Sequence, residues 1–172
     1  DDGLTSGNIA SNDNAHETCR TYIDINYDFS ALGEQAIISK ATLRISQLTS
    51  FSDGGVNMGL FTVDKAWNPN TITWNNQVIE HFHLDTKQTT AKANKWIEYN
   101  ITEYINNIAQ GIATDNGLVL KYLNERQQCE VLNNNERVGR EPQVIIDWGE
   151  NWEDPALAEM ALDDITINVR PV

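Results

Sequence analysis

The stretch AWNPNTITWNN, residues 66–76, decides how the rest of the chain is expected to fold. Pro69 fixes its own φ angle and disfavours the α region for Asn68, so the chain must turn there. Residues 71–73, Thr-Ile-Thr, favour an extended backbone because they are β-branched. Trp67 and Trp74 flank this segment, and each can bury on the order of 150–250 Å². We therefore predict that the two tryptophans close one end of a small β core around which the other strands pack.

Segments on both sides of this stretch alternate between apolar and polar residues, which is typical of half-buried strands. In residues 20–29, one face is predicted to hold Thr21, Ile23, Ile25, Tyr27 and Phe29. In residues 36–48, the apolar face is predicted to hold Ile37, Ala41, Leu43 and Ile45. Further strands are predicted over residues 56–64, 96–101, 118–123, 129–133 and 143–148. About eight or nine strands separated by turns are typical of an antiparallel sandwich.

One amphipathic helix interrupts this series of strands. Asn100 is the predicted N-cap, with Glu103 at the capping-box position, and Gly111 ends the helix. Its apolar face is predicted to hold Ile101, Tyr104, Ile105 and Ile108. A short helix between strands is best interpreted as a crossover packed over one end of a sandwich. The predicted fold is therefore all-β, a jelly-roll-like antiparallel sandwich with one short crossover helix.

Two polar segments show no periodicity. Residues 1–18 are predicted to be a loop-like arm with at most a short edge strand near Leu4, and residues 77–95 are predicted to be irregular. His81 and His83 lie near acidic residues, but two histidines without a third placed ligand are more often solvated than bound to zinc. The oxygen donors that suit calcium are Asp1, Asp2, Asp13 and Asn14. Their spacing matches no EF-hand loop, so no cofactor is required and a structural calcium ion is left open.

Charge and length limit the function. The formal net charge of −13 argues against nucleic acid as a partner, because phosphate binding needs clustered Lys and Arg. No apolar run approaches membrane-spanning length. Residues 1–148 are predicted to form the sandwich module. Residues 149–172 are predicted to be an acidic linker and a terminal strand, either docked on this chain or leading to a next module.

The two cysteines, Cys19 and Cys129, are far apart in the sequence. A disulfide between them closes a loop of about 110 residues, and loop entropy gives it roughly 4–5 kcal/mol of stabilisation. The alternative is two buried thiols, and the sequence favours neither over the other.

Several blocks in the middle of the chain resemble a known family. They are RTYIDINYDFS (20–30), ISKATLRI (38–45), FTVDKAWNPNTITWNN (61–76), WIEYNITEYINNIAQG (96–111), NGLVLK (116–121) and EPQVIIDW (141–148). In this order they resemble the DNRLRE-type β-sandwich modules, which overlap carbohydrate-binding module family 96. The resemblance spans about residues 19–148, and the N-terminal Asn-Tyr-Gly element of the family is not recognisable in residues 1–18. It implies a secreted or surface-attached microbial protein, usually modular, with this domain accessory to an enzyme or an adhesive array.

The resemblance leads to the hypothesis of a non-catalytic carbohydrate-binding module whose partners are a polysaccharide and adjacent domains. Trp67, Trp74 and Trp96 are predicted to be framework, because large aromatic residues near strands are mostly buried. The candidate ligand-binding residues lie in late loops: Tyr122, Asn124, Arg126, Asn134, Arg137 and Arg140. Their arginines suit a uronate by bidentate pairing, although pairing with local acids is at least as good an interpretation.

Two other functions were weighed. The first is a structural or adhesive spacer in a cell-surface protein, which needs no glycan site and suits the acidic tail. The second is an enzyme. None of the nucleophile, metalloprotease or phosphate-loop motifs is present, and although the many pairs of acidic residues leave a glycosidase open, no cleft-forming second layer is evident. The sequence therefore predicts no catalytic activity.

Overall fold

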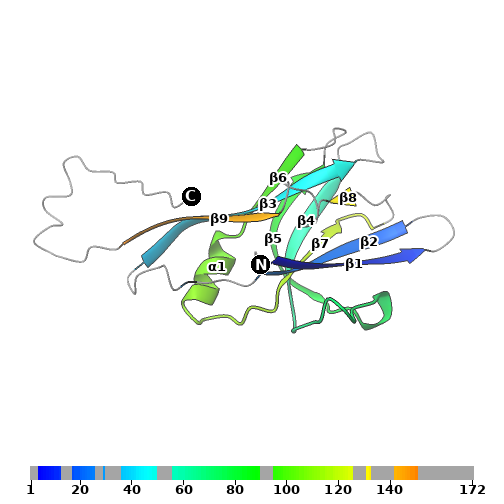
Figure 1. Ribbon diagram of the computed structural model, residues 1–172, viewed down its shortest axis with the longest axis horizontal. Coiled ribbons are helices and arrows are strands. Elements are labelled where there is room, and N and C mark those ends of the chain that lie inside the picture. The colour runs from blue at the N-terminus through cyan, green and yellow to red at the C-terminus, as the bar shows by residue number, and fades with distance from the viewer. Residues whose placement is uncertain are drawn as a thin grey trace, which may run out of the picture.

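The computed structural model describes residues 4–12, 17–25, 29, 36–49, 56–89, 95–125, 131–132 and 142–150. These residues form two antiparallel sheets that pack face to face (Figure 1). The five-stranded sheet has the order β1–β2–β7–β4–β5, formed by Leu4–Asn12 (β1), Glu17–Ile25 (β2), Leu118–Tyr122 (β7), Asn57–Val63 (β4) and Glu80–Gln88 (β5). In the second sheet the long strand β3 (Ala36–Thr49) pairs with β6 (Lys95–Asn100), β8 (Val131–Leu132) and β9 (Gln143–Glu150). The predicted all-β antiparallel sandwich with one helix is confirmed.

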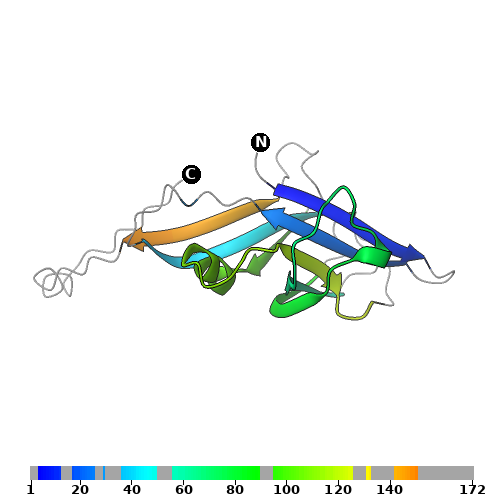
Figure 2. The same ribbon diagram turned by 90° about the horizontal axis from the view of Figure 1, so that it is seen from below.

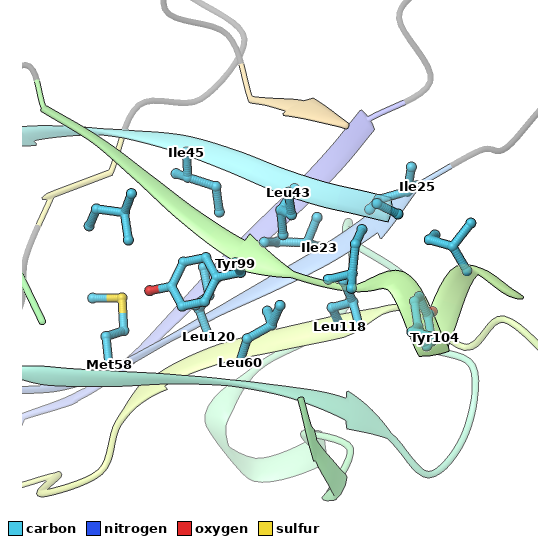
Figure 3. Packing of buried hydrophobic residues seen from close by; sticks show 14 of the residues in the cluster. Ile23, Ile25, Leu43, Ile45, Met58, Leu60, Tyr99, Tyr104, Leu118 and Leu120 are labelled. Atoms are coloured by element: carbon cyan, nitrogen blue, oxygen red, sulfur yellow. The ribbon is translucent and has the colours of Figure 1, made fainter. Parts of the chain in front are cut away.

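The main core lies between the two sheets. Side chains from β2, β3, β4, β6 and β7 point toward one another there, as Figure 3 shows for Ile23, Leu43, Leu60, Tyr99 and Leu118. The predicted inward face of β3 is confirmed for Ala41, Leu43 and Ile45, all of which are buried. β7 is apolar on both faces because it is a central strand whose outer face is covered as well.

One residue of the predicted core face of β3 points the other way. Ile37 is 51% exposed, whereas its neighbour Ile38 is buried. The pairing of β3 with β9 shifts register between Ile38 and Lys40. A β-bulge inserts an extra residue, which reverses the alternation of side chains on one side of it. The prediction for Ile37 is therefore wrong, and the bulge is the reason.

Two segments without an apolar period are strands, and the edge strand predicted near Leu4 is confirmed but is longer than expected. Residues 4–12 form β1, which pairs with β2 from Leu4↔Ile25 to Asn12↔Glu17. Residues 80–88 form β5, which pairs with β4. Both are edge strands of the same sheet, and edge strands are often polar, so the lack of an apolar pattern is a weak guide there.

The predicted helix is α1, Thr102–Ala109, and it packs against β3 at one end of the sandwich (Figure 1). Its N-cap is Ile101 and not Asn100, although the Asn100 side-chain oxygen accepts the Thr102 N–H at 3.0 Å. Gly111, at φ 68°, ends the helix as predicted. The N–H groups of Gly111 and Ile112 bond to the carbonyls of Ile108 and Asn107, which is a Schellman motif. No helix among the described residues has the length and apolar character to cross a membrane.

The stretch that decided the prediction packs elsewhere than expected. Trp67 and Trp74 are half-buried and join a second cluster with Tyr22, Val63 and Val119. This cluster lies on the outer face of the five-stranded sheet, and the loop that bears the tryptophans crosses β2 on that side (Figure 2). The two tryptophans therefore do not close the main core.

The backbone of that loop also differs from the prediction. Residues 71–73 are not a strand; Thr71 and Ile72 donate backbone N–H groups to the Asn68 carbonyl, and a single 3₁₀ turn follows at Trp74–Asn76. The Asn76 side-chain amide donates to the Thr71 carbonyl at 2.9 Å. Asparagine side chains thus supply the backbone hydrogen bonds that a neighbouring strand would otherwise supply. These local bonds outweigh the β propensity of Thr-Ile-Thr.

Candidate functional site: a groove between β5 and α1

Two adjoining cavities lie between the edge strand β5 and the helix α1, and we call them together the β5–α1 groove. The first cavity has a volume of about 540 Å³ and reaches the end of β4 and the turn at residues 113–117. The second, of about 610 Å³, reaches Ile37 on β3 and Gln110 at the end of α1. Both are lined by His83, Leu84, Glu103, Tyr104 and Asn107. Each has the size typical of a small-molecule site, about 300–1,000 Å³.

The wall formed by β5 presents aromatic rings because its pairing with β4 is irregular. The register shifts twice, between Leu60 and Phe61 and again between Phe61 and Val63. Bulges of this kind re-aim side chains and are common near binding sites. Phe82 is 62% exposed and lines the first cavity, and its ring centroid lies 3.8 Å from that of His81.

The position of β5 is fixed by the carboxylate of Asp85, which joins the two sheets. One oxygen of Asp85 accepts the Thr86 N–H at 2.7 Å, and the other accepts the Asn100 N–H of β6 at 2.8 Å. Lys87 lies 2.9 Å from the same carboxylate. Burial alone would raise the pKa of Asp85, but these hydrogen bonds together hold its pKa below the usual value.

The opposite wall is the turn at residues 113–117. Asp115 accepts the Gly117 N–H at 2.8 Å and a hydrogen bond from the Tyr104 hydroxyl, so the turn is attached to α1. Burial raises the pKa of Asp115, and these hydrogen bonds offset that only in part. Gly117 has φ 86°, and an added Cβ would lie 2.8 Å from Trp67 Nε1. Trp67 in turn packs on Tyr22, with ring centroids 5.4 Å apart.

A charged network supports the loop that bears the tryptophans. Arg20 makes a bidentate pair with Glu125 at 2.7 and 3.0 Å and donates to the Gln77 side chain at 2.8 Å. Its guanidinium lies 5.2 Å from the ring centroid of Trp74, within the range of a cation–π contact. Arg20 therefore fixes the loop through an ion pair and a ring at the same time.

The groove chemistry combines an exposed ring with amide and carboxylate side chains. Its charged residues, among the described lining, are Asp64 and Glu103, and His81 and His83 lie beside them. Its amide side chains are those of Asn100, Asn106, Asn107, Gln110 and Asn116. Sugar rings have apolar faces and hydroxyl rims, which match a lining of aromatic rings and hydrogen-bonding side chains. Among the described residues, no cluster of three His, Cys, Asp or Glu side chains could hold a metal ion.

Of the predicted ligand-binding residues, the structure describes Tyr122 and Asn124, and neither lines this groove. Tyr122 lies in the main core and is 2% exposed, so its ring packs inward and does not face solvent. Asn124 is exposed just after β7. Outside the described residues lie Arg126, Asn134, Arg137, Arg140, Asp1, Asp2, Asp13, Asn14 and Cys129, and for Cys19 only the backbone, in β2, is described. The binding, calcium and disulfide hypotheses for these residues stay predictions.

The sequence analysis missed the residues that line the groove. From the sequence, His81 and His83 are candidates only for a zinc site, and nothing in the local pattern marks Phe82 between them as a ligand contact. The one signal available was an aromatic residue within a polar segment, which is easily overlooked when no strand is predicted there. Glu103 and Asn107 lie one turn apart on the polar side of α1, a spacing that puts both on one face.

Taken together, the described residues form an antiparallel β-sandwich with a groove at one side. The family model described as carbohydrate-binding module family 96 matches residues 5–147, and the chain belongs to this family. The match begins within β1, so the family domain includes the N-terminal strand that the predicted range of residues 19–148 left out. No match was found among curated proteins.

Proposed function

We propose that this chain is a non-catalytic glycan-binding module and that the β5–α1 groove is its binding site. The observation that supports the proposal most strongly is the exposed Phe82 ring within a groove lined by amides and carboxylates, in a chain of a carbohydrate-binding family. Because the Phe82 ring is 62% exposed and lines the groove, its face is open to contact with the apolar face of a sugar ring.

The test is affinity electrophoresis of the whole chain through gels that contain different polysaccharides. Phe82→Ala should lower the affinity for a retarding polysaccharide about tenfold, because about half the burial energy of a phenylalanine, roughly 1–1.5 kcal/mol, is lost. The matched control is Ile79→Ala, since Ile79 is 64% exposed and outside the groove. Retardation by no polysaccharide at all would refute the proposal and favour a spacer module.

The same gels distinguish this groove from the site predicted on the late loops. The charged side chains among the described lining of the groove are acidic, so the groove favours a neutral glycan. The predicted set with Arg126, Arg137 and Arg140 favours a uronate instead. Retardation by uronate polymers that is lost in Arg137→Ala and kept in Phe82→Ala would assign binding to the loops.

The context of the module is part of the proposal. The resemblance supports an accessory role in a secreted or surface-attached multidomain protein, where the module holds an enzyme or an adhesive array close to its glycan. Incubation of the chain with mixed polysaccharides should release no reducing sugar, and release would overturn the non-catalytic role. Antibody detection of the whole protein in culture medium and on intact cells tests where the protein acts.

A further inference from the structure

We propose that the β5–α1 groove binds an internal stretch of a linear glycan, several sugar rings long, and not a single sugar or a chain end. This inference rests on the proposed function. Its basis is the continuity of the two cavities, which share five lining residues on β5 and α1. A single sugar ring fills only part of one cavity, whereas a chain can lie across both.

The two ends of the groove resemble each other in their chemistry. Phe82 lines the first cavity and is 62% exposed, and Ile37 lines the second and is 51% exposed. Both lie next to a register shift, in β5 and in β3, which turns an apolar side chain away from the core. Because both side chains are largely exposed, each can contact a sugar ring, and a glycan chain that lies across both cavities can contact both.

The middle of the groove is polar and firmly held. Asn107 and Glu103 belong to both cavities, and their side chains can hydrogen-bond hydroxyl groups. The helix that bears them is attached to β3, because Asn106 donates to the Ile38 carbonyl at 3.0 Å and Thr102 Oγ1 accepts the Ala41 N–H at 2.9 Å. The groove therefore has an apolar side chain in each cavity and polar side chains shared between the cavities. A linear glycan likewise alternates apolar ring faces with hydroxyl groups along its length.

The experiment is isothermal titration of the whole chain with β-1,4-linked oligosaccharides of glucose, xylose and mannose, and with uronate oligosaccharides, from one to six units. In at least one series the affinity should rise more than tenfold between two and six units. Phe82→Ala and Ile37→Ala should each lower the affinity for the six-unit member about tenfold. For the two-unit member, only one of the two variants should have an effect, because a short ligand occupies one cavity.

The controls separate this inference from the proposed function. Ile112→Ala is a matched change, since Ile112 is 69% exposed and outside both cavities, and urea unfolding of all variants should be unchanged. One- or two-unit sugars that bind as tightly as six-unit sugars, with a dependence on Phe82, would overturn the chain-binding inference and leave the proposed function standing. Tight six-unit binding that neither variant weakens would place the site elsewhere, and no binding in titrations or gels would overturn both.

Discussion

Replacing Gly117 by alanine tests the link between the tryptophan loop and the wall of the groove. At φ 86° an alanine is strained by about 1–2 kcal/mol. Its Cβ would also lie 2.8 Å from the Ile23 carbonyl oxygen and 2.8 Å from Trp67 Nε1. Trp67 must shift to relieve one contact and the backbone of β2 or of residue 117 to relieve the other, which together add about 1–3 kcal/mol of overpacking. We expect Gly117→Ala to lower the free energy of unfolding by about 2–5 kcal/mol in total.

The matched control is Gly111→Ala, which has the same kind of backbone strain without the contacts. Gly111 has φ 68°, and an added Cβ meets nothing within 4 Å, so its loss should stay near 1–2 kcal/mol. Urea unfolding followed by circular dichroism measures both, and at a slope of about 2 kcal/mol/M the midpoints should differ by about 0.5–1.5 M. Equal midpoints for the two variants would show that backbone strain accounts for the whole loss and that neither contact of the added Cβ, with Ile23 or with Trp67, destabilises the fold.

Three further predictions concern stability and charge. Asp85→Ala should lower the free energy of unfolding by about 1.5–3 kcal/mol, because its charge-assisted hydrogen bonds with Thr86 and with Asn100 of β6 are lost; a loss no larger than that of the half-exposed Lys87→Ala would contradict this. The contribution of Asp85 is complete above its unfolded pKa of about 3.9 and disappears as the pH falls through its lowered folded pKa, so variant and parent should converge in acid urea titrations. Arg20→Lys should lower the free energy of unfolding by about 1.5–3 kcal/mol, since lysine cannot keep the bidentate pair with Glu125, and an unchanged melting curve would argue against it. The raised pKa of Asp115 means that its ionised form destabilises the fold; Asp115→Asn should therefore be at least as stable as the parent at pH 7, with the advantage vanishing below pH about 4, and a clear loss at pH 7 would refute the assignment.

The interior of the fold could be predicted because burial imposes a period on the sequence. Leu43 and Ile45 alternate with polar residues on β3, and β7 is apolar on both faces because both are covered. The helix end at Gly111 was equally accessible, since a positive φ angle at a helix terminus favours glycine. Both features, burial along a strand and a positive φ angle at a helix end, depend on a residue and its near neighbours in the sequence, so a local pattern can reveal them.

The edge strands and the groove could not be predicted for the opposite reason. β1 and β5 are edge strands whose sequences show no strict apolar period, and β5 contains two register shifts that no local pattern indicates. Phe82 is exposed because of those shifts, and Ile37 because of another on β3. A bulge depends on the pairing partner, which lies far away in the sequence, so the exposed apolar residues of the candidate site are visible only once the strands are paired.

The position of Trp67 on the outer face of the five-stranded sheet links it to the wall of the groove. Had Trp67 closed the main core, its replacement would affect stability alone. It packs instead against Tyr22 on the outer face, and Gly117 beneath it ends the turn that forms one wall of the groove. The Tyr104 hydroxyl bonds to Asp115 in the same turn, so the helix, the turn and the tryptophan loop hold one another in place. A residue on the far side of the sheet thus positions the groove, and Trp67→Ala should weaken glycan binding although Trp67 does not line either cavity.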